Sequence, residues 1–223
     1  MWNRQQVKEQ AKQIMKRNYW KMFVVTLLTG ILTGGKTTII ERVQDFASNN
    51  LSYDAQPIFY SSNFQYIFYS FISVASILGI LYTIFIGNII VVGKNGYFIK
   101  NHDENPELGE IFKGFKGNYL NVVKILFLMD LKTLLWLFLF IVPGVIKAYE
   151  YSMIPYLLAE NPSLSASEAF SLSKQMTTGQ KMDLFVLDLS FIGWIILGLI
   201  CCGIGILFVL PYPEATRAEV YLI

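Results

Sequence analysis

Charged residues are scarce in this sequence. Only 15% of its 223 residues are Asp, Glu, Lys or Arg and 54% are apolar, whereas soluble domains carry about 25% charged residues. So few charges cannot cover a water-soluble globule of this size, but a lipid bilayer can face the remaining apolar surface. The composition therefore predicts a single integral membrane domain over residues 1–223.

Histidine and cysteine are equally scarce. His102 is the only histidine, and the two cysteines, Cys201 and Cys202, are neighbours inside an apolar run. Adjacent cysteines rarely satisfy disulfide geometry, and one isolated histidine offers neither a metal site nor a Ser-His-Asp triad. A net charge of only +2 argues against nucleic-acid binding. We therefore expect no metal, no nucleic acid and no catalytic residues.

One nucleotide-binding pattern is present. Gly30 to Thr37 has the spacing of a phosphate-binding loop, which requires a β-strand immediately before it. The apolar run before Gly30 instead predicts a helix, and the distribution of lysines and arginines places Lys36 outside the cell. We therefore expect no nucleotide and no other cofactor.

Long apolar runs recur along the chain. A bilayer core about 30 Å thick needs roughly 20 helical residues. The run from Tyr119 to Val142 has this length, although Asp130 and Lys132 lie inside it. We predict an all-α, polytopic transmembrane bundle with five or six crossings. The crossings are 22–35, 64–92, 119–142 and 182–200. The segment 203–218 is a further crossing or a tail, and 145–159 is a short crossing or a re-entrant helix.

Amphipathic stretches separate these runs. We predict interfacial helices at 1–21, 107–117 and 163–178. In the last of them Ser165 is the expected N-cap, three residues before Glu168. The first helix has two interpretations: it lies in the headgroup layer with its lysines on anionic lipid, or it is a solvated cap that packs on the bundle.

The basic residues set the predicted orientation. They are more frequent before the first crossing than in the loop 36–63 that follows it, so the positive-inside rule places the N-terminus in the cytoplasm and this loop outside. We therefore predict a multi-pass protein of the plasma membrane.

The second half of the chain resembles itself without gaps at an offset of 58 residues. The predicted repeat covers about 110–160 and 168–218, and both copies would enter the membrane from the same side. The aligned pairs include Glu110 with Glu168, Phe112 with Phe170, Lys116 with Lys174, Asp130 with Asp188, and Trp136 with Trp194.

Five ionisable residues are expected at or near membrane depth, where such groups usually face a bundle interior, a partner or a water-filled cavity. Lys147 and Glu150 are three positions apart, so they can pair on one helix face. One hypothesis is a shared polar pocket, and the alternative is that these residues link helices structurally or are hydrated near the interface. The five are Asp130, Lys132, Lys147, Glu150 and Asp188.

Proline and glycine mark the predicted breaks. Proline lacks a backbone donor and glycine adopts turn conformations at low cost. We predict a chain reversal at Pro143 and Gly144, and further hinges at Gly203 and Pro211.

Several motifs resemble a known family. They are IVPGVIKAYEYSM at 141–153, AENP at 159–162, Gly179, LSFIGW at 189–194 and PY at 211–212. They are similar to domain-of-unknown-function family 975, and the opening residues are similar as well. The resemblance implies an integral membrane protein found mainly in Gram-positive bacteria, without an agreed activity. It also implies distant kinship with the membrane domain of some glycerophosphodiester phosphodiesterases, whose catalytic domain this chain lacks.

Three functions are compatible with these sequence features. The leading hypothesis is a non-enzymatic membrane protein that binds or translocates a lipid or an amphipathic peptide through the polar pocket. The alternative is a membrane-embedded interaction or regulatory subunit, with a membrane protein or a second copy as partner. A lipid-modifying enzyme ranks last, because no nucleophile and base pair and no metal set is visible.

Overall fold

The computed structural model describes residues 2–33, 62–200 and 204–223, and every regular element in these ranges is helical. The predicted all-α class is confirmed. Lys36, Gly203, both cysteines and the loop 36–63 up to residue 61 lie outside the described residues. The elements are α1 (Arg4–Leu32), α4 (Ser62–Tyr82), the π-helix η2 (Thr83–Gly87), α5 (Asn88–Lys100), the 3-10 helix η3 (Leu108–Phe115), α6 (Tyr119–Leu139), α7 (Ile141–Glu150), α8 (Ile154–Glu160), α9 (Ala166–Thr177), α10 (Lys181–Ile200), α11 (Ile204–Val209) and α12 (Pro211–Leu222).

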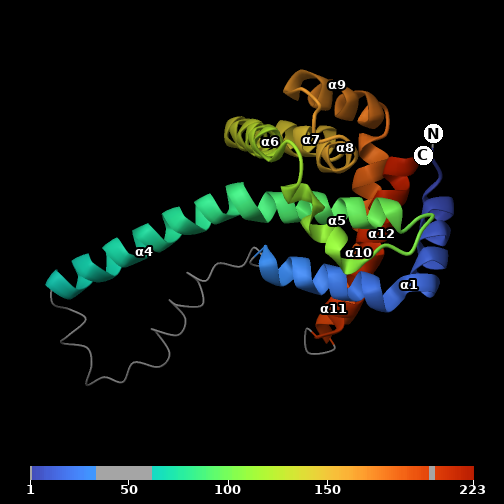
Figure 1. Ribbon diagram of the computed structural model, residues 1–223, viewed down its shortest axis with the longest axis horizontal. Coiled ribbons are helices and arrows are strands. Elements are labelled where there is room, and N and C mark those ends of the chain that lie inside the picture. Colours follow the sequence, from blue (N-terminus) through green and yellow to red (C-terminus); the bar gives the residue numbers. More distant parts are fainter. Residues whose placement is uncertain (1, 34–61, 201–203) are drawn as a thin grey trace.

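One continuous helical rod passes through the molecule, because α4 leads through η2 into α5 (Figure 1). The α4 end projects away from the other helices, while α5 packs against α1, α8 and α12. The helices α6 and α7 form a hairpin beside α5, and α10 runs across the direction of α1 and α5 (Figure 1). The two chain ends lie close together where α1 meets α12.

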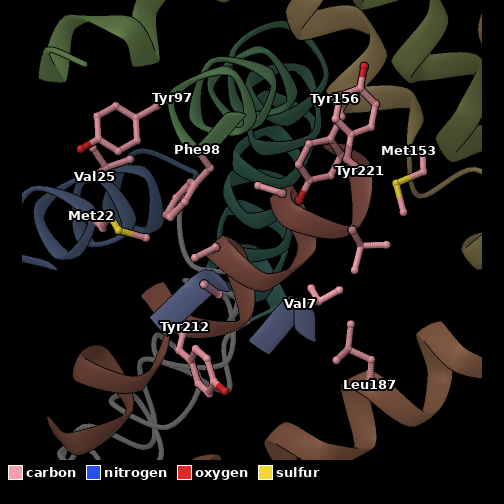
Figure 2. Close-up of a cluster of buried hydrophobic side chains, with 14 of the residues drawn as sticks. Val7, Met22, Val25, Tyr97, Phe98, Met153, Tyr156, Leu187, Tyr212 and Tyr221 are labelled. Carbon is pink, nitrogen blue, oxygen red and sulfur yellow. The ribbon is translucent and has the colours of Figure 1, made fainter. Parts of the chain in front are cut away.

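The main hydrophobic core lies where α1, α5, α8, α10 and α12 meet. Figure 2 shows side chains from these five helices in one cluster, including Val7, Tyr97, Tyr156, Leu187 and Tyr212. Burying such a side chain contributes about 1.5–3 kcal/mol. This core holds the first and last helices of the chain together.

A second core joins α5, α6, α8 and α9. It contains Ile89, Val122, Ile125, Leu158 and Ala169, of which Val122 is 1% exposed and the others are fully buried. Only the first half of α6 takes part, because its buried residues end at Leu126. The second half of α6 therefore presents its apolar side chains outward.

The first predicted amphipathic helix and the first crossing form a single helix. The helix α1 runs from Arg4 to Leu32 and is kinked at Asn18, whose backbone is not helical. Its first half packs on the bundle, because Val7 and Ala11 are fully buried. Packing on the bundle agrees with the second interpretation of that segment, while the exposed Lys12 and Lys16 are compatible with the first, contact with anionic lipid. The Asn18 side chain donates a hydrogen bond to Asn101 at 2.8 Å, which fixes the kink against the end of α5.

The α6–α7 turn lies three residues before the predicted one. Phe140 is extended and separates the two helices. Pro143 lies in the first turn of α7, where a missing backbone donor costs little. A Cβ on Gly144 would lie 2.6 Å from Leu137 Cα, so this glycine allows the two helices to touch. The last predicted hinge, Pro211, is the first residue of α12.

Two helices among the described residues are long and apolar enough to cross a bilayer. They are Tyr69–Lys100, whose most apolar stretch has mean hydropathy 2.2, and Lys181–Ile200, whose most apolar stretch has mean hydropathy 2.1. They overlap the predicted crossings 64–92 and 182–200. The most apolar stretches of these helices are only 17% and 22% buried, whereas the core helix of a soluble protein is mostly covered. Their exposure supports association with a membrane.

The predicted segments 145–159 and 203–218 each contain a helix boundary. The former is divided between α7 and α8, which have 10 and 7 residues. At 1.5 Å per residue, neither helix reaches across a core of about 30 Å. The crossing and the re-entrant alternatives for 145–159 both stay predictions. In the latter, α12 is largely buried in the main core.

The C-terminal helix α12 is fastened by polar contacts to four other parts of the chain. Lys94 of α5 pairs with Glu214 at 2.6 Å. His102, which follows α5, contacts the buried Glu219 at 2.9 Å. The other two contacts are Arg217 with Asp188 of α10 and Tyr221 with Glu160 of α8. The last helix is therefore part of the core and not a loose tail.

The predicted N-cap of α9 is confirmed. The Ser165 hydroxyl accepts a hydrogen bond from the Glu168 amide, and the Glu168 carboxylate accepts one from the Ser165 amide. Because this capping box satisfies two orphan donors, we expect Ser165→Ala to lower the free energy of unfolding by about 1 kcal/mol. Thermal unfolding followed by circular dichroism measures this change. The exposed neighbour Ser167→Ala is the control, and an equal effect of both variants would contradict the prediction.

Candidate functional site

Glu150, at the end of α7, lies in a buried cluster of charges. It is 4% exposed, and its two carboxylate oxygens contact Lys147 Nζ at 2.7 Å and Lys181 Nζ at 2.5 Å. Its backbone carbonyl accepts a hydrogen bond from the Ser173 hydroxyl at 2.7 Å. The predicted pairing of Lys147 with Glu150 is therefore confirmed. The cluster joins α7 to α9 and α10.

Asp188 of α10 lies in a second polar cluster, which contacts α7 through Tyr149. Its Oδ2 accepts hydrogen bonds from the Tyr149 hydroxyl at 2.8 Å and from Arg217 Nη2 at 2.6 Å. Tyr149 precedes Glu150 in α7, so the two clusters sit on consecutive residues. Asp188 thereby connects α7, α10 and α12.

Asp130 and Lys132 have other partners. Asp130 Oδ2 accepts a hydrogen bond from Asn88 Nδ2 at 2.8 Å, directly after η2. Lys132 Nζ lies over the Phe170 ring, 3.8 Å from its centroid. Both residues are exposed on α6. The two aspartates that the predicted repeat aligns therefore differ in their surroundings.

These contacts agree with a structural role for the predicted polar residues. Each of the three acids receives hydrogen bonds from a residue of another helix, and each is thus a link between elements. Sequence reasoning missed Lys181, Arg217 and Asn88. No spacing rule within one helix connects these three residues to their partners.

A different part of the molecule holds an apolar cavity of about 440 Å³. It lies between α1 and the segments α10, α11 and α12. Its walls are mainly aromatic and aliphatic, and two lysines of α1 are part of its lining. The lining residues are Lys12, Met15, Lys16, Tyr19, Trp194, Phe208, Val209 and Tyr212.

Helical spacing explains the α1 wall of this cavity. Positions 12, 15, 16 and 19 are three and four apart, so they share one face. The Tyr19 hydroxyl donates a hydrogen bond to the Phe208 carbonyl at 3.0 Å, and the Phe23 and Phe208 rings stack at 5.0 Å between centroids. These contacts hold α11 against α1. Trp194 and Phe208 are 49% and 45% exposed, so the apolar side of the cavity is open.

A stripe of basic residues follows the same side of α1. Arg4, Lys8, Lys12 and Lys16 are spaced four apart, which places like charges one turn from each other. Lys8 donates a hydrogen bond to the Ser190 hydroxyl at 2.5 Å. Partial burial lowers the pKa of Lys8, and the charges of Lys12 and Arg4 lower it further. The positive charges of the stripe therefore repel one another, and the protonated form of Lys8 is disfavoured.

Lys12 and Lys16 differ from the other lysines that line contacts between helices. Lys94, Lys147 and Lys181 each have a carboxylate within 2.7 Å. In the described parts of the chain, no carboxylate lies within ion-pair distance of Lys12 or Lys16. The residues that surround the cavity thus offer cations and apolar surface together. Sequence reasoning identified these lysines but not the cavity, because its other walls come from helices far along the chain.

Among the described residues, no group of three His, Cys, Asp or Glu side chains is arranged to hold a metal ion. Of the phosphate-loop pattern, Gly30 to Leu32 belong to the helix α1, and the lysine lies outside the described residues. This part of the pattern has no strand before it, as the sequence predicted.

The described part of the chain is all-helical, and two of its helices are long and apolar enough to cross a membrane, which supports association with a membrane. Residues 139–223 match the family model described as Protein of unknown function (DUF975), so the resemblance seen in the sequence is confirmed over this part of the chain. The matched residues include the clusters of Glu150 and Asp188 and the α10 to α12 walls of the cavity. No curated protein and no solved structure matches the chain.

Proposed function

We propose that the protein is a non-enzymatic integral protein of the plasma membrane that binds an amphipathic ligand, either a lipid or an amphipathic peptide. The observation that carries this proposal is the cavity of about 440 Å³, whose walls are apolar and whose lining includes the stems of the exposed residues Lys12 and Lys16. Ligand pockets commonly have about 300–1,000 Å³, mostly apolar walls and a few polar groups that fix orientation. The cavity replaces the polar residues of α6, α7 and α10 as the proposed binding site.

The proposal includes several membrane crossings with a cytoplasmic N-terminus and a duplicated unit. Support for the duplication comes from the order of elements. The helices η3 and α9 begin at Leu108 and Ala166, the offset of 58 that the sequence indicated. Each is followed by a glycine with positive φ, Gly117 at 83° and Gly179 at 79°, and then by a long apolar helix, α6 or α10. The order of elements is therefore repeated, but these later features are 62 residues apart and not 58. A non-glycine residue would be strained at these two turns.

Native mass spectrometry of gently extracted protein tests the binding function. We expect a retained amphiphile on the wild-type protein. Met15→Trp should reduce the retained fraction several-fold, because the larger side chain fills the cavity. Met182→Trp is the matched control, since Met182 is 70% exposed on α10 and does not line the cavity. An unchanged adduct in Met15→Trp, with both variants folded, would contradict the proposal.

A second function is favoured by one observation. Along α4, large apolar side chains point outward on several faces, including Tyr66, Phe71, Ile77 and Leu81 at 75%, 71%, 57% and 45% exposure. Lipid can cover this helix, and so can a partner protein in the membrane. The alternative is therefore an interaction or regulatory subunit. Co-purification of one stoichiometric partner through α4, without any bound amphiphile, would favour it.

A further inference from the structure

We infer that the cavity between α1 and α10–α12 binds one anionic phospholipid, with its phosphate against Lys12 and Lys16 and an acyl chain along Trp194 and Phe208. This inference rests on the proposed function, because it names the ligand class of the same cavity. It makes the protein selective for the charge of a lipid headgroup.

The charge of the site selects an anion. Lys12 and Lys16 are one helical turn apart, and the remaining basic residues of the stripe, Arg4 and Lys8, extend the positive field along α1. Only Glu9 among residues 4–17 is acidic. A phosphate between the two ammonium groups would relieve their repulsion and accept charge-assisted hydrogen bonds from both. A zwitterionic headgroup would bind less well, because its own positive group would be repelled by the lysines of the stripe.

The walls of the site select an acyl chain. Met15, Trp194, Phe208 and Val209 surround most of the cavity and offer few hydrogen-bonding groups. A free phosphate or a sugar would be desolvated against these walls without compensation. An apolar chain gains from leaving water there. The occupant is thus an amphiphile with its charge at one end.

The position of the site fits a lipid that enters from the side. The kink at Asn18 divides the polar half of α1 from its apolar half, with the two lysines on the polar side. Tyr19 and Trp20 follow the kink, and Trp20 is 69% exposed. Such aromatic residues are typical of the membrane interface. The lysines therefore lie at headgroup level while the half-exposed Trp194 and Phe208 face the acyl region.

Lipid titration of the full-length, delipidated protein tests this inference. Phosphatidylglycerol and phosphatidylcholine with identical acyl chains are the probes, and native mass spectrometry measures the bound fractions. We expect phosphatidylglycerol to bind at least fivefold more tightly. The double variant Lys12→Gln/Lys16→Gln should lose this preference and keep its weaker binding of phosphatidylcholine, while Lys12→Arg/Lys16→Arg should retain the preference.

The control removes two positive charges elsewhere. Lys116→Gln/Lys124→Gln changes two exposed lysines outside the cavity and should leave the preference unchanged. Equal binding of both lipids by the wild-type protein would overturn the inference and leave the proposed function intact. Binding of neither lipid would also overturn the inference, and the proposed function would then depend on an amphiphile of another class being retained by the wild-type protein. Displacement of phosphatidylglycerol by an equal concentration of inorganic phosphate would identify a free anion as the ligand and also overturn the inference.

Discussion

Gly93→Ala is expected to destabilise the protein by about 3 kcal/mol or more, because it forces apart two backbones. A Cβ at Gly93 would lie 1.8 Å from the carbonyl oxygen of Ile111, and no side-chain rotation can relieve a clash with backbone. Gly114 on the facing η3 is similarly close, 2.7 Å from the Ile89 carbonyl oxygen. The contact of α5 with η3 thus depends on glycine on both sides. Thermal unfolding of the detergent-solubilised protein measures the loss.

Two glycines of the same helical rod serve as controls for this variant. A Cβ at Gly96 would meet Ala159 at 3.5 Å, which is ordinary contact, and a Cβ at Gly79 would meet no atom within 4 Å. Because alanine is the better helix former by roughly 1 kcal/mol, Gly79→Ala and Gly96→Ala should be neutral or stabilising. If Gly93→Ala behaved like these two, α5 and η3 would not be packed as described.

Glu150→Ala is expected to cost about 3–5 kcal/mol, because it leaves Lys147 and Lys181 without their shared counter-charge. Both lysines are about one quarter exposed while the carboxylate is buried. The loss would separate α7 from α10 and disturb the adjacent contact of Tyr149 with Asp188. A denaturant or thermal unfolding curve measures the change, with the isosteric Glu150→Gln as an intermediate case that keeps the shape of the side chain.

The control for the Glu150 variant is an exposed acid. Asp103 is 87% exposed and contacts His102 at 3.7 Å, so Asp103→Asn should change stability by less than about 1 kcal/mol. Similar losses in Asp103→Asn and Glu150→Ala would mean that the Glu150 cluster contributes no more than a surface ion pair.

Features set by neighbouring residues could be predicted from the sequence. The capping box of Ser165 and Glu168 depends on a spacing of three, and so does the pair of Lys147 and Glu150. The helix Lys181–Ile200 could be predicted from its continuous apolar composition, which is also a local property of the sequence. In each case the relevant partners lie within one element, where helix geometry alone decides which side chains meet.

Features that depend on distant residues could not be predicted. Arg217 reaches Asp188 only because α12 packs beside α10, and the cavity exists only because α11 is held against α1. The reversal between α6 and α7 was misplaced for a related reason. Proline is tolerated in the first turn of a helix, so Pro143 marked the start of α7 and not the break at Phe140.

The burial of α12 against α1 also constrains the order of events during synthesis. Val7 and Ala11 emerge from the ribosome more than 200 residues before Ala218 and Val220, which belong to the same core. The apolar face of the first helix therefore stays uncovered until α12 has been made. Ribosomes stalled before α12 should carry a nascent chain that proteases still cut within the first 20 or so residues, although its apolar helices have already formed.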